Sequence, residues 1–89
     1  MKPHVRNYMR YFDLGEQDDI CCEICGKGGR IDRGGFDLHH IIYRSHGGTD
    51  KVENIILLCR DHHDKAHDGR IHAQVLTARH EMFMNEAKN

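Results

Sequence analysis

The sequence predicts a small α+β domain, with a helix at each end and a strand, loop, strand and helix in the centre. Three observations support this class. Apolar residues recur at helical spacing over 4–14 and 72–87, two short apolar runs lie between these segments, and a polar segment without helix breakers follows the second run. A chain of 89 residues encloses one small core, so we expect a single domain over 1–89.

The first helix is expected over 4–14, and Gly15 is expected to stop it. Residues 20–29 combine cysteines with glycines, which tolerate the backbone angles of a metal-binding turn. The last segment, 72–87, is expected to form an amphipathic helix whose spacing is set by Val75, Leu76, Arg79, Met82 and Phe83.

The centre of the chain alternates between apolar and polar segments. Residues 34–43 predict a strand or one arm of a hairpin, 44–53 a polar loop, and 54–59 a short apolar strand. Residues 60–67 contain no breaker and predict a helix that ends near Gly69.

Composition indicates metal binding more than any other property. The chain has nine histidines and four cysteines, and histidine is a poor core residue but a common metal ligand. No stretch has the pattern of a signal peptide or a membrane span, so we expect a cytoplasmic protein whose cysteines bind metal rather than form disulfides. The formal net charge of −1 does not by itself indicate a nucleic-acid partner.

The segment LCRDHHDKAH, residues 58–67, concentrates one cysteine and three histidines. An α-helix turns by about 100° per residue, so Cys59 and His62 share one side of the expected helix. His63 and His67 share another side, about a quarter turn away. One ion could not easily collect all four side chains, and two metal sites fit the spacing better.

The first site is expected to be a closed, structural zinc site. Cys22 and Cys25 form a C-x-x-C pair that joins Cys59 and His62, and zinc takes four nitrogen or sulfur ligands in a tetrahedron. The spacing to Cys25 favours Cys22 over Cys21, which we expect to be a small core residue. The alternative is that these are buried cysteines near a surface histidine.

The second site has His63 and His67 and lacks a third ligand, for which the pair His39–His40 is the obvious donor. Three protein ligands leave positions open for water and substrate, as in catalytic sites. Neighbouring side chains on a strand point to opposite faces, so one member of the pair could face elsewhere unless the strand bends. The alternative is a set of exposed histidines on a polar helix.

The order of these motifs resembles the HNH nucleases, also called ββα-metal or His-Me finger nucleases, over about residues 22–67. The resemblance is carried by CEICG, LHHII, GGTDKVENIILLC and HHDKAH. It implies a ββα-metal core with a zinc knuckle, flanked here by the two terminal helices. As a small stand-alone protein with these motifs, the chain is similar to HNH proteins encoded by bacteriophages and mobile elements.

The resemblance also implies roles for single residues. His40 stands at the position of the general base, and His39 at that of a metal ligand. Asn54 stands where the family fixes the loop and orients the base. His63 fills the final-histidine position, as a catalytic residue and metal ligand, and His67 matches a further ligand of histidine-rich members. In many relatives a cysteine stands where this chain has His62.

The implied reaction is metal-dependent hydrolysis of DNA that leaves 5′-phosphate and 3′-hydroxyl ends. A neutral histidine can take a proton from water, and a divalent ion can act as Lewis acid on the phosphate. Three imidazoles favour Zn²⁺, Ni²⁺, Co²⁺ or Mn²⁺, while metal availability keeps Mg²⁺ in consideration.

The expected partner is DNA. Basic side chains around the motif are candidates for contacts with its backbone, with plain solvated charges as the alternative: Arg44, Arg60, Lys65 and Arg70. Specificity is expected to be low, or to come from a homodimer or a partner such as a phage packaging protein. Four histidines are expected to lie at the surface or in caps: His4, His46, His72 and His80.

Two other functions compete with a nuclease. A non-catalytic zinc-ribbon module that binds nucleic acid would need only the zinc ligands, and a metal buffer would use the histidine excess in several weak sites. Neither accounts for the simultaneous presence of His39, His40, Asn54, His63 and His67.

Overall fold

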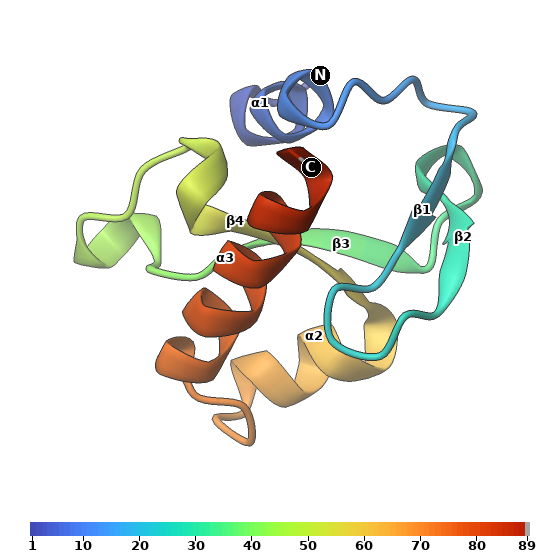
Figure 1. Ribbon diagram of the computed structural model, residues 1–89. Coiled ribbons are helices and arrows are strands. Elements are labelled where there is room, and N and C mark those ends of the chain that lie inside the picture. The colour runs from blue at the N-terminus through green and yellow to red at the C-terminus, as the bar shows by residue number, and fades with distance from the viewer. Residues whose placement is uncertain (89) are drawn as a thin grey trace.

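The computed structural model describes residues 1–88 and shows an α+β fold with the expected order of elements (Figure 1). The helices are α1 (Pro3–Tyr11), α2 (Arg60–His67) and α3 (Ala73–Lys88). The strands are β1 (Asp19–Cys21), β2 (Gly28–Arg30), β3 (Phe36–His40) and β4 (Ile55–Cys59). None of the helices within residues 1–88 has the length and apolar character that a membrane span requires.

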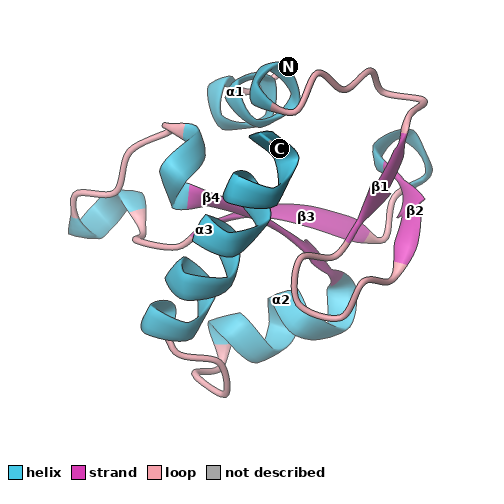
Figure 2. Ribbon diagram, viewed as in Figure 1, coloured by secondary structure: helices cyan, strands magenta, loops and turns pink. Residues whose placement is uncertain are grey.

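The four strands form two separate antiparallel pairs (Figure 2). In the first pair Ile20 lies opposite Gly29, and in the second Leu38 lies opposite Leu57. The sequence predicted only the turn of the first pair. Its arms have three residues each, and glycines in β2 carry no strand propensity, so no periodic pattern reveals them.

Every residue of β4 is buried, because its two faces supply two different core clusters. Ile56 and Leu58 pack in one cluster with Leu76 of α3, while Ile55 and Leu57 pack in the other with Tyr8 of α1. Figure 1 shows the consequence, with β3 and β4 in the middle, α1 on one side and α2 on the other. The β3–β4 pair and α2 form the ββα centre.

Helix α1 is shorter than the sequence predicted. It ends at Tyr11, and Asp13 takes a left-handed backbone conformation with φ of 54°. The amide of Leu14 then donates to the carbonyl of Met9 over 2.8 Å, which satisfies a free carbonyl at the helix end. The stop therefore lies at Asp13, two residues before Gly15.

Helix α3 buries only part of the expected face. Leu76 is buried and Phe83 is half-buried, but Val75 and Met82 are 50% and 58% exposed, and His80 is buried instead. The expectation that His80 lies at the surface is wrong, because its side chain has a buried partner far away in the sequence.

That partner is Glu23, whose carboxylate is fully buried. His80 Nδ1 lies 2.7 Å from Glu23 Oε1, and His80 Nε2 lies 2.6 Å from the carbonyl oxygen of Val52. The other carboxylate oxygen of Glu23 accepts hydrogen bonds from the Tyr8 hydroxyl (2.8 Å) and the Leu57 amide (3.0 Å). Both nitrogens of His80 face acceptors, so the ring carries both protons and forms an ion pair with Glu23.

The first prediction concerns this ion pair. His80→Gln leaves the buried Glu23 charge without its counterion, and we expect it to lower the free energy of unfolding by about 3–5 kcal/mol. His72→Gln, at an exposed histidine next to the start of α3, is the control and should change stability little. Urea titration followed by circular dichroism measures both, and equal stability of the two variants would contradict the assigned ion pair.

The pH dependence of the same variant gives a second test. Burial acts to lower the pKa of His80, but the hydrogen bond and charge of Glu23 outweigh it, and the pKa is raised from 6.5. A raised folded-state pKa stabilises the protein fully below pH 6.5, and this contribution is lost as the pH rises through the folded-state value. The stability gap between wild type and His80→Gln should therefore narrow above pH 6.5. A stability gap that widens as the pH rises would show that the pKa of His80 is not raised in the folded protein.

Candidate metal centres and active site

Four ligand atoms, one each from Cys22, Cys25, Cys59 and His62, lie within 4.8 Å of one another. The Sγ atoms of Cys25 and Cys59 are 3.8 Å apart, and Cys59 Sγ is 3.2 Å from His62 Nδ1. A tetrahedral zinc ion with Zn–S bonds of about 2.3 Å separates neighbouring sulfurs by about 3.8 Å. All four cysteines are free of disulfides. Three thiols and one imidazole at these distances fit a closed, four-ligand zinc knuckle.

Local backbone geometry brings the two halves of the knuckle together. The amide of Gly26 donates to the carbonyl of Cys22 over 2.9 Å, and Gly26 has a φ of 78°, which favours glycine. Cys59 is the N-cap of α2, so His62 lies in the first helical turn. Burial acts to raise the pKa of Cys22, but backbone hydrogen bonds around its thiol outweigh burial and lower the pKa, which favours the metal-binding thiolate.

The structure places Cys22, and not Cys21, in this group. Cys21 is half-buried on β1, where it lines an apolar cavity of about 360 Å³ beside Tyr8 and Phe83. Burial raises the pKa of the Cys21 thiol as it does that of Cys59, so position and not acidity excludes Cys21 from the four-ligand group.

A second group joins β3 to α2. His39, His63 and His67 each place one nitrogen within 4.8 Å of the others, and the Nε2 atoms of His63 and His67 are 2.9 Å apart. His39 is 5% exposed, and burial together with the neighbouring imidazoles lowers its pKa to about 4. It is therefore neutral near pH 7, which is the form that binds metals.

The remaining nitrogen of His67 has a hydrogen-bond partner, because His67 Nδ1 lies 3.2 Å from the Tyr43 hydroxyl. His63 Nδ1 lies 3.0 Å from Asp37 Oδ2, but the two atoms do not have hydrogen-bond geometry. Histidines that bind metals usually hold their second nitrogen, and His67 is held in this way, so the group fits a divalent ion. Sequence reasoning missed Asp37 and Tyr43. The position of Asp37, two residues before His39 on the same strand, was the available signal.

His40 lies at the end of β3 and lines the same cleft as His39, His63 and His67, with a volume of about 410 Å³. His39 and His40 both lie within β3 and have different neighbours, because the His39 ring packs against His63 and His67 whereas the His40 ring packs against His4. Both side chains nevertheless line the cleft.

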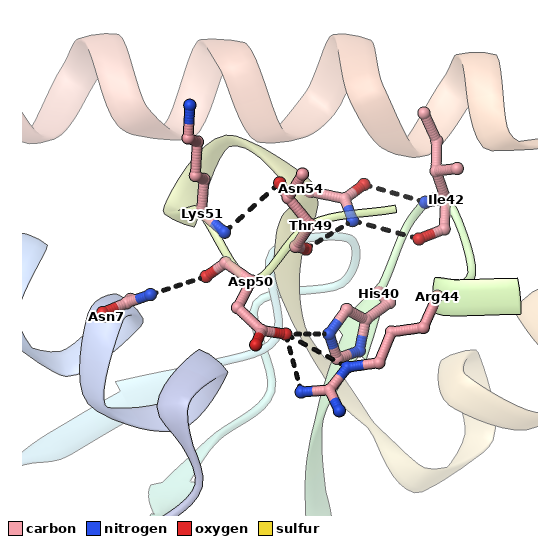
Figure 3. Close-up of polar contacts among 8 residues, drawn as sticks. All are labelled: Asn7, His40, Ile42, Arg44, Thr49, Asp50, Lys51 and Asn54. Carbon is pink, nitrogen blue, oxygen red and sulfur yellow. Dashed lines mark hydrogen bonds and ion pairs between the residues drawn. The ribbon is translucent and has the colours of Figure 1, made fainter. Parts of the chain in front are cut away.

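The partner of His40 is Asp50, which the sequence did not single out. His40 Nε2 lies 2.8 Å from Asp50 Oδ1, and Arg44 donates to the same oxygen (Figure 3). Hydrogen bonds from His40 and then Arg44 lower the pKa of Asp50. An ionised carboxylate only accepts hydrogen bonds, so Nε2 of His40 carries its proton and Nδ1 keeps the lone pair. The carboxylate therefore fixes both the orientation and the tautomer of the His40 ring.

Asn54 holds the loop that follows β3. Its Oδ1 accepts from the amide of Ile42 over 2.8 Å, and its Nδ2 donates to the carbonyls of Ile42 (3.0 Å) and Thr49 (2.9 Å) (Figure 3). Within the described part of the chain, the ring of His40 is hydrogen-bonded by Asp50 rather than by Asn54. The loop is therefore fixed by one side chain and the histidine by another.

Each of the four basic residues singled out in the sequence has an acidic neighbour. The pairs are Arg44–Asp50 (2.8 Å), Arg60–Asp37 (3.4 Å), Lys65–Asp61 (3.1 Å) and Arg70–Asp68 (3.2 Å). Arg44 lines the histidine cleft, and Arg60 shares Asp37 with His63. Lys65 and Arg70 pair with acids on or just after α2 and are not among the residues that line the cleft.

The expectation that His4 lies at the surface is wrong. His4 is half-buried, and the centroid of its ring lies 4.6 Å from that of His40. Helix α1, which the motifs do not include, therefore contacts a residue that lines the cleft.

Comparison with known proteins identifies the centre of the chain. Residues 22–69, more than half of the chain, match the family model described as HNH endonuclease. The chain is also 45% identical over 38 residues to a protein of Enterobacteria phage T4, "Probable mobile endonuclease C". That alignment covers 43% of this chain and 18% of the phage protein. No solved structure matches the chain significantly.

The third prediction separates the two adjacent cysteines. Cys22→Ser removes a thiolate from the knuckle, so we expect loss of the tightly held zinc and, with it, of folded structure. Cys21→Ser should keep both, because Cys21 lies outside the four-ligand group. Elemental analysis of the dialysed proteins and circular dichroism give the readouts. If Cys21→Ser lost the zinc and Cys22→Ser kept it, the assigned register would be wrong.

Proposed function

The chain belongs to the HNH endonuclease family, and from this premise we propose that it hydrolyses phosphodiester bonds of DNA with one divalent ion and with His40 as general base. We treat residues 1–89 as one nuclease domain. The observation that most strongly supports this proposal is the cleft, which is lined by His39 and His40 of β3 and by His63 and His67 of α2. A zinc-ribbon module that only binds nucleic acid would need the knuckle and not this second group.

Protons and positions in the cleft follow from the contacts of each side chain. The Asp50 carboxylate holds Nε2–H of His40, so Nδ1 takes the proton of the attacking water. Asn54 keeps the loop beside the cleft in place through Ile42 and Thr49. Water attack at phosphorus with departure of the 3′ oxygen leaves 5′-phosphate and 3′-hydroxyl ends.

His39, His63 and His67 would hold the divalent ion, which when bound supplies Lewis-acid stabilisation of the phosphate and the departing oxygen. Tyr43 fixes the His67 ring through its Nδ1 atom, and the Asp37 carboxylate lies 3.0 Å from Nδ1 of His63. Three imidazoles favour Zn²⁺, Ni²⁺, Co²⁺ or Mn²⁺, and Mg²⁺ remains a candidate for activity because the open positions accept oxygen ligands.

DNA is the proposed substrate, in keeping with the endonuclease family and with the name of the phage relative. Arg44 and Arg60 are exposed and lie at the histidine group, so a DNA phosphate can replace the carboxylate that each of them contacts. Lys65 and Arg70 lie further along α2 and its end, where they would contact phosphates only outside the cleft.

The fourth prediction tests the reaction. Wild-type protein incubated with supercoiled plasmid and each of several divalent ions should nick or linearise the DNA, and His40→Ala should lower the rate by at least about 100-fold. His46→Ala, at an exposed histidine outside the metal groups, is the control. An intact plasmid with wild type under every ion would favour the non-catalytic module.

The fifth prediction concerns Asp50. Asp50→Asn removes the charge that holds Nε2–H of His40, so kcat should fall while KM for DNA changes little. The loss should be smaller than that of His40→Ala, because the base remains present. If kcat stayed at the wild-type value, Asp50 would have no part in orienting His40.

A further inference from the structure

A third group of side chains with the donor atoms of a metal site lies at the edge of the cleft. It shares His40 and Asp50 with the active site and shares no ligand with the two metal groups described above. His4 of α1, His40 at the end of β3 and Asp50 of the loop each place one ligand atom within 4.8 Å of the others. We propose that these three residues form an exchangeable site for a borderline transition ion such as Zn²⁺, and that an ion bound there inhibits the enzyme. The inhibition rests on the proposed role of His40, whereas the binding does not.

The first support is an unsatisfied nitrogen. His4 Nδ1 is buried and has no hydrogen-bond partner within residues 1–88. Buried polar atoms nearly always have a partner, and an exception commonly marks a place for a bound water or ion. The His4 ring packs against His40, and one of its nitrogens lies within 4.8 Å of the donor atoms of His40 and Asp50.

The second support is the chemistry of the donors. Two imidazoles and one carboxylate make a common ligand set for zinc, and they leave a fourth position for water. The three donors come from separate segments that are already fixed. Asn7 of α1 donates to the main-chain carbonyl of Asp50 over 2.8 Å, which ties the loop to the helix that carries His4 (Figure 3).

Arg44 opposes an ion at this site, because its guanidinium donates to Asp50 Oδ1 over 2.8 Å. The Arg44 side chain is 59% exposed, so it can turn into solvent when an ion binds. This competition makes the site weaker than the cysteine knuckle, and the bound ion should exchange readily.

Occupation of the site would change the tautomer of His40. Its Nε2 atom lies 2.8 Å from Asp50 Oδ1 and is the nitrogen closest to the carboxylate ligand. An ion that takes Nε2 moves the ring proton to Nδ1, which is the nitrogen that the proposed general base keeps free. Zinc in excess of the knuckle would therefore stop the reaction without unfolding the protein.

Counting bound zinc tests the site without any assay of activity. Zinc-loaded protein is dialysed against a fixed excess of Zn²⁺ and analysed for metal, as wild type, His4→Phe, His67→Ala and the double variant. His4→Phe keeps the ring contact with His40 and removes both nitrogens. We expect each single variant to bind one ion fewer than wild type, and the double variant to bind two fewer. Asp50→Asn should also lose one ion, and His72→Gln should lose none.

A His4→Phe protein that binds as many ions as wild type would overturn the site. For the inhibition, Mg²⁺-driven plasmid cleavage is measured against added Zn²⁺ and normalised to each variant without zinc. The midpoint of inhibition should rise at least about tenfold in His4→Phe, the scale on which even outer metal contacts act. Equal midpoints would reject the inhibitory role. An inactive wild type would reject the proposed function and leave the zinc counts to decide the site.

Discussion

The buried carboxylate of Glu23 is the contact on which most of this small fold depends. It accepts hydrogen bonds from the Tyr8 hydroxyl of α1 and the Leu57 amide of β4, and it pairs with the His80 imidazole of α3. Removing two charges from water is costly, and the cost is offset only when hydrogen bonds satisfy both groups, as they do here. Glu23 also lies between Cys22 and Cys25, so the turn that would bind zinc and the ion pair that joins the helices are one piece of chain.

Much of the fold could be predicted from local patterns, because apolar runs mark the strands at 36–40 and 55–59 and a segment without helix breakers marks the helix at 60–67. The division of α2 between two metal groups followed from helix geometry alone. The Glu23–His80 pair could not be found in this way, since its partners are 57 residues apart and no local pattern connects them. A histidine that stands alone in a sequence is expected to be exposed. Only the packing of α3 against the knuckle shows that His80 is buried.

The candidate site shows the same division between local and distant information. Histidines at fixed spacing identify its ligands, whereas the side chains that hold those histidines come from ordinary acidic positions. Asp37 and Asp50 look like solvated charges in the sequence, yet each lies within 3.0 Å of a histidine nitrogen. Helix α1 lies outside the residues that match the family, and it still contributes His4 and Asn7 to the surroundings of His40.

His62 and His63 are consecutive residues, and they face different metal groups. Because α2 begins at the knuckle, an ion held by Cys59 and His62 would anchor the first turn of the helix that carries His63 and His67. If both ions bind as proposed, the thiolate-bound ion would therefore order the ligands of the other ion. A newly made chain in a zinc-starved cell would then lack a usable cleft even with abundant magnesium, and zinc supply would decide how much competent enzyme accumulates.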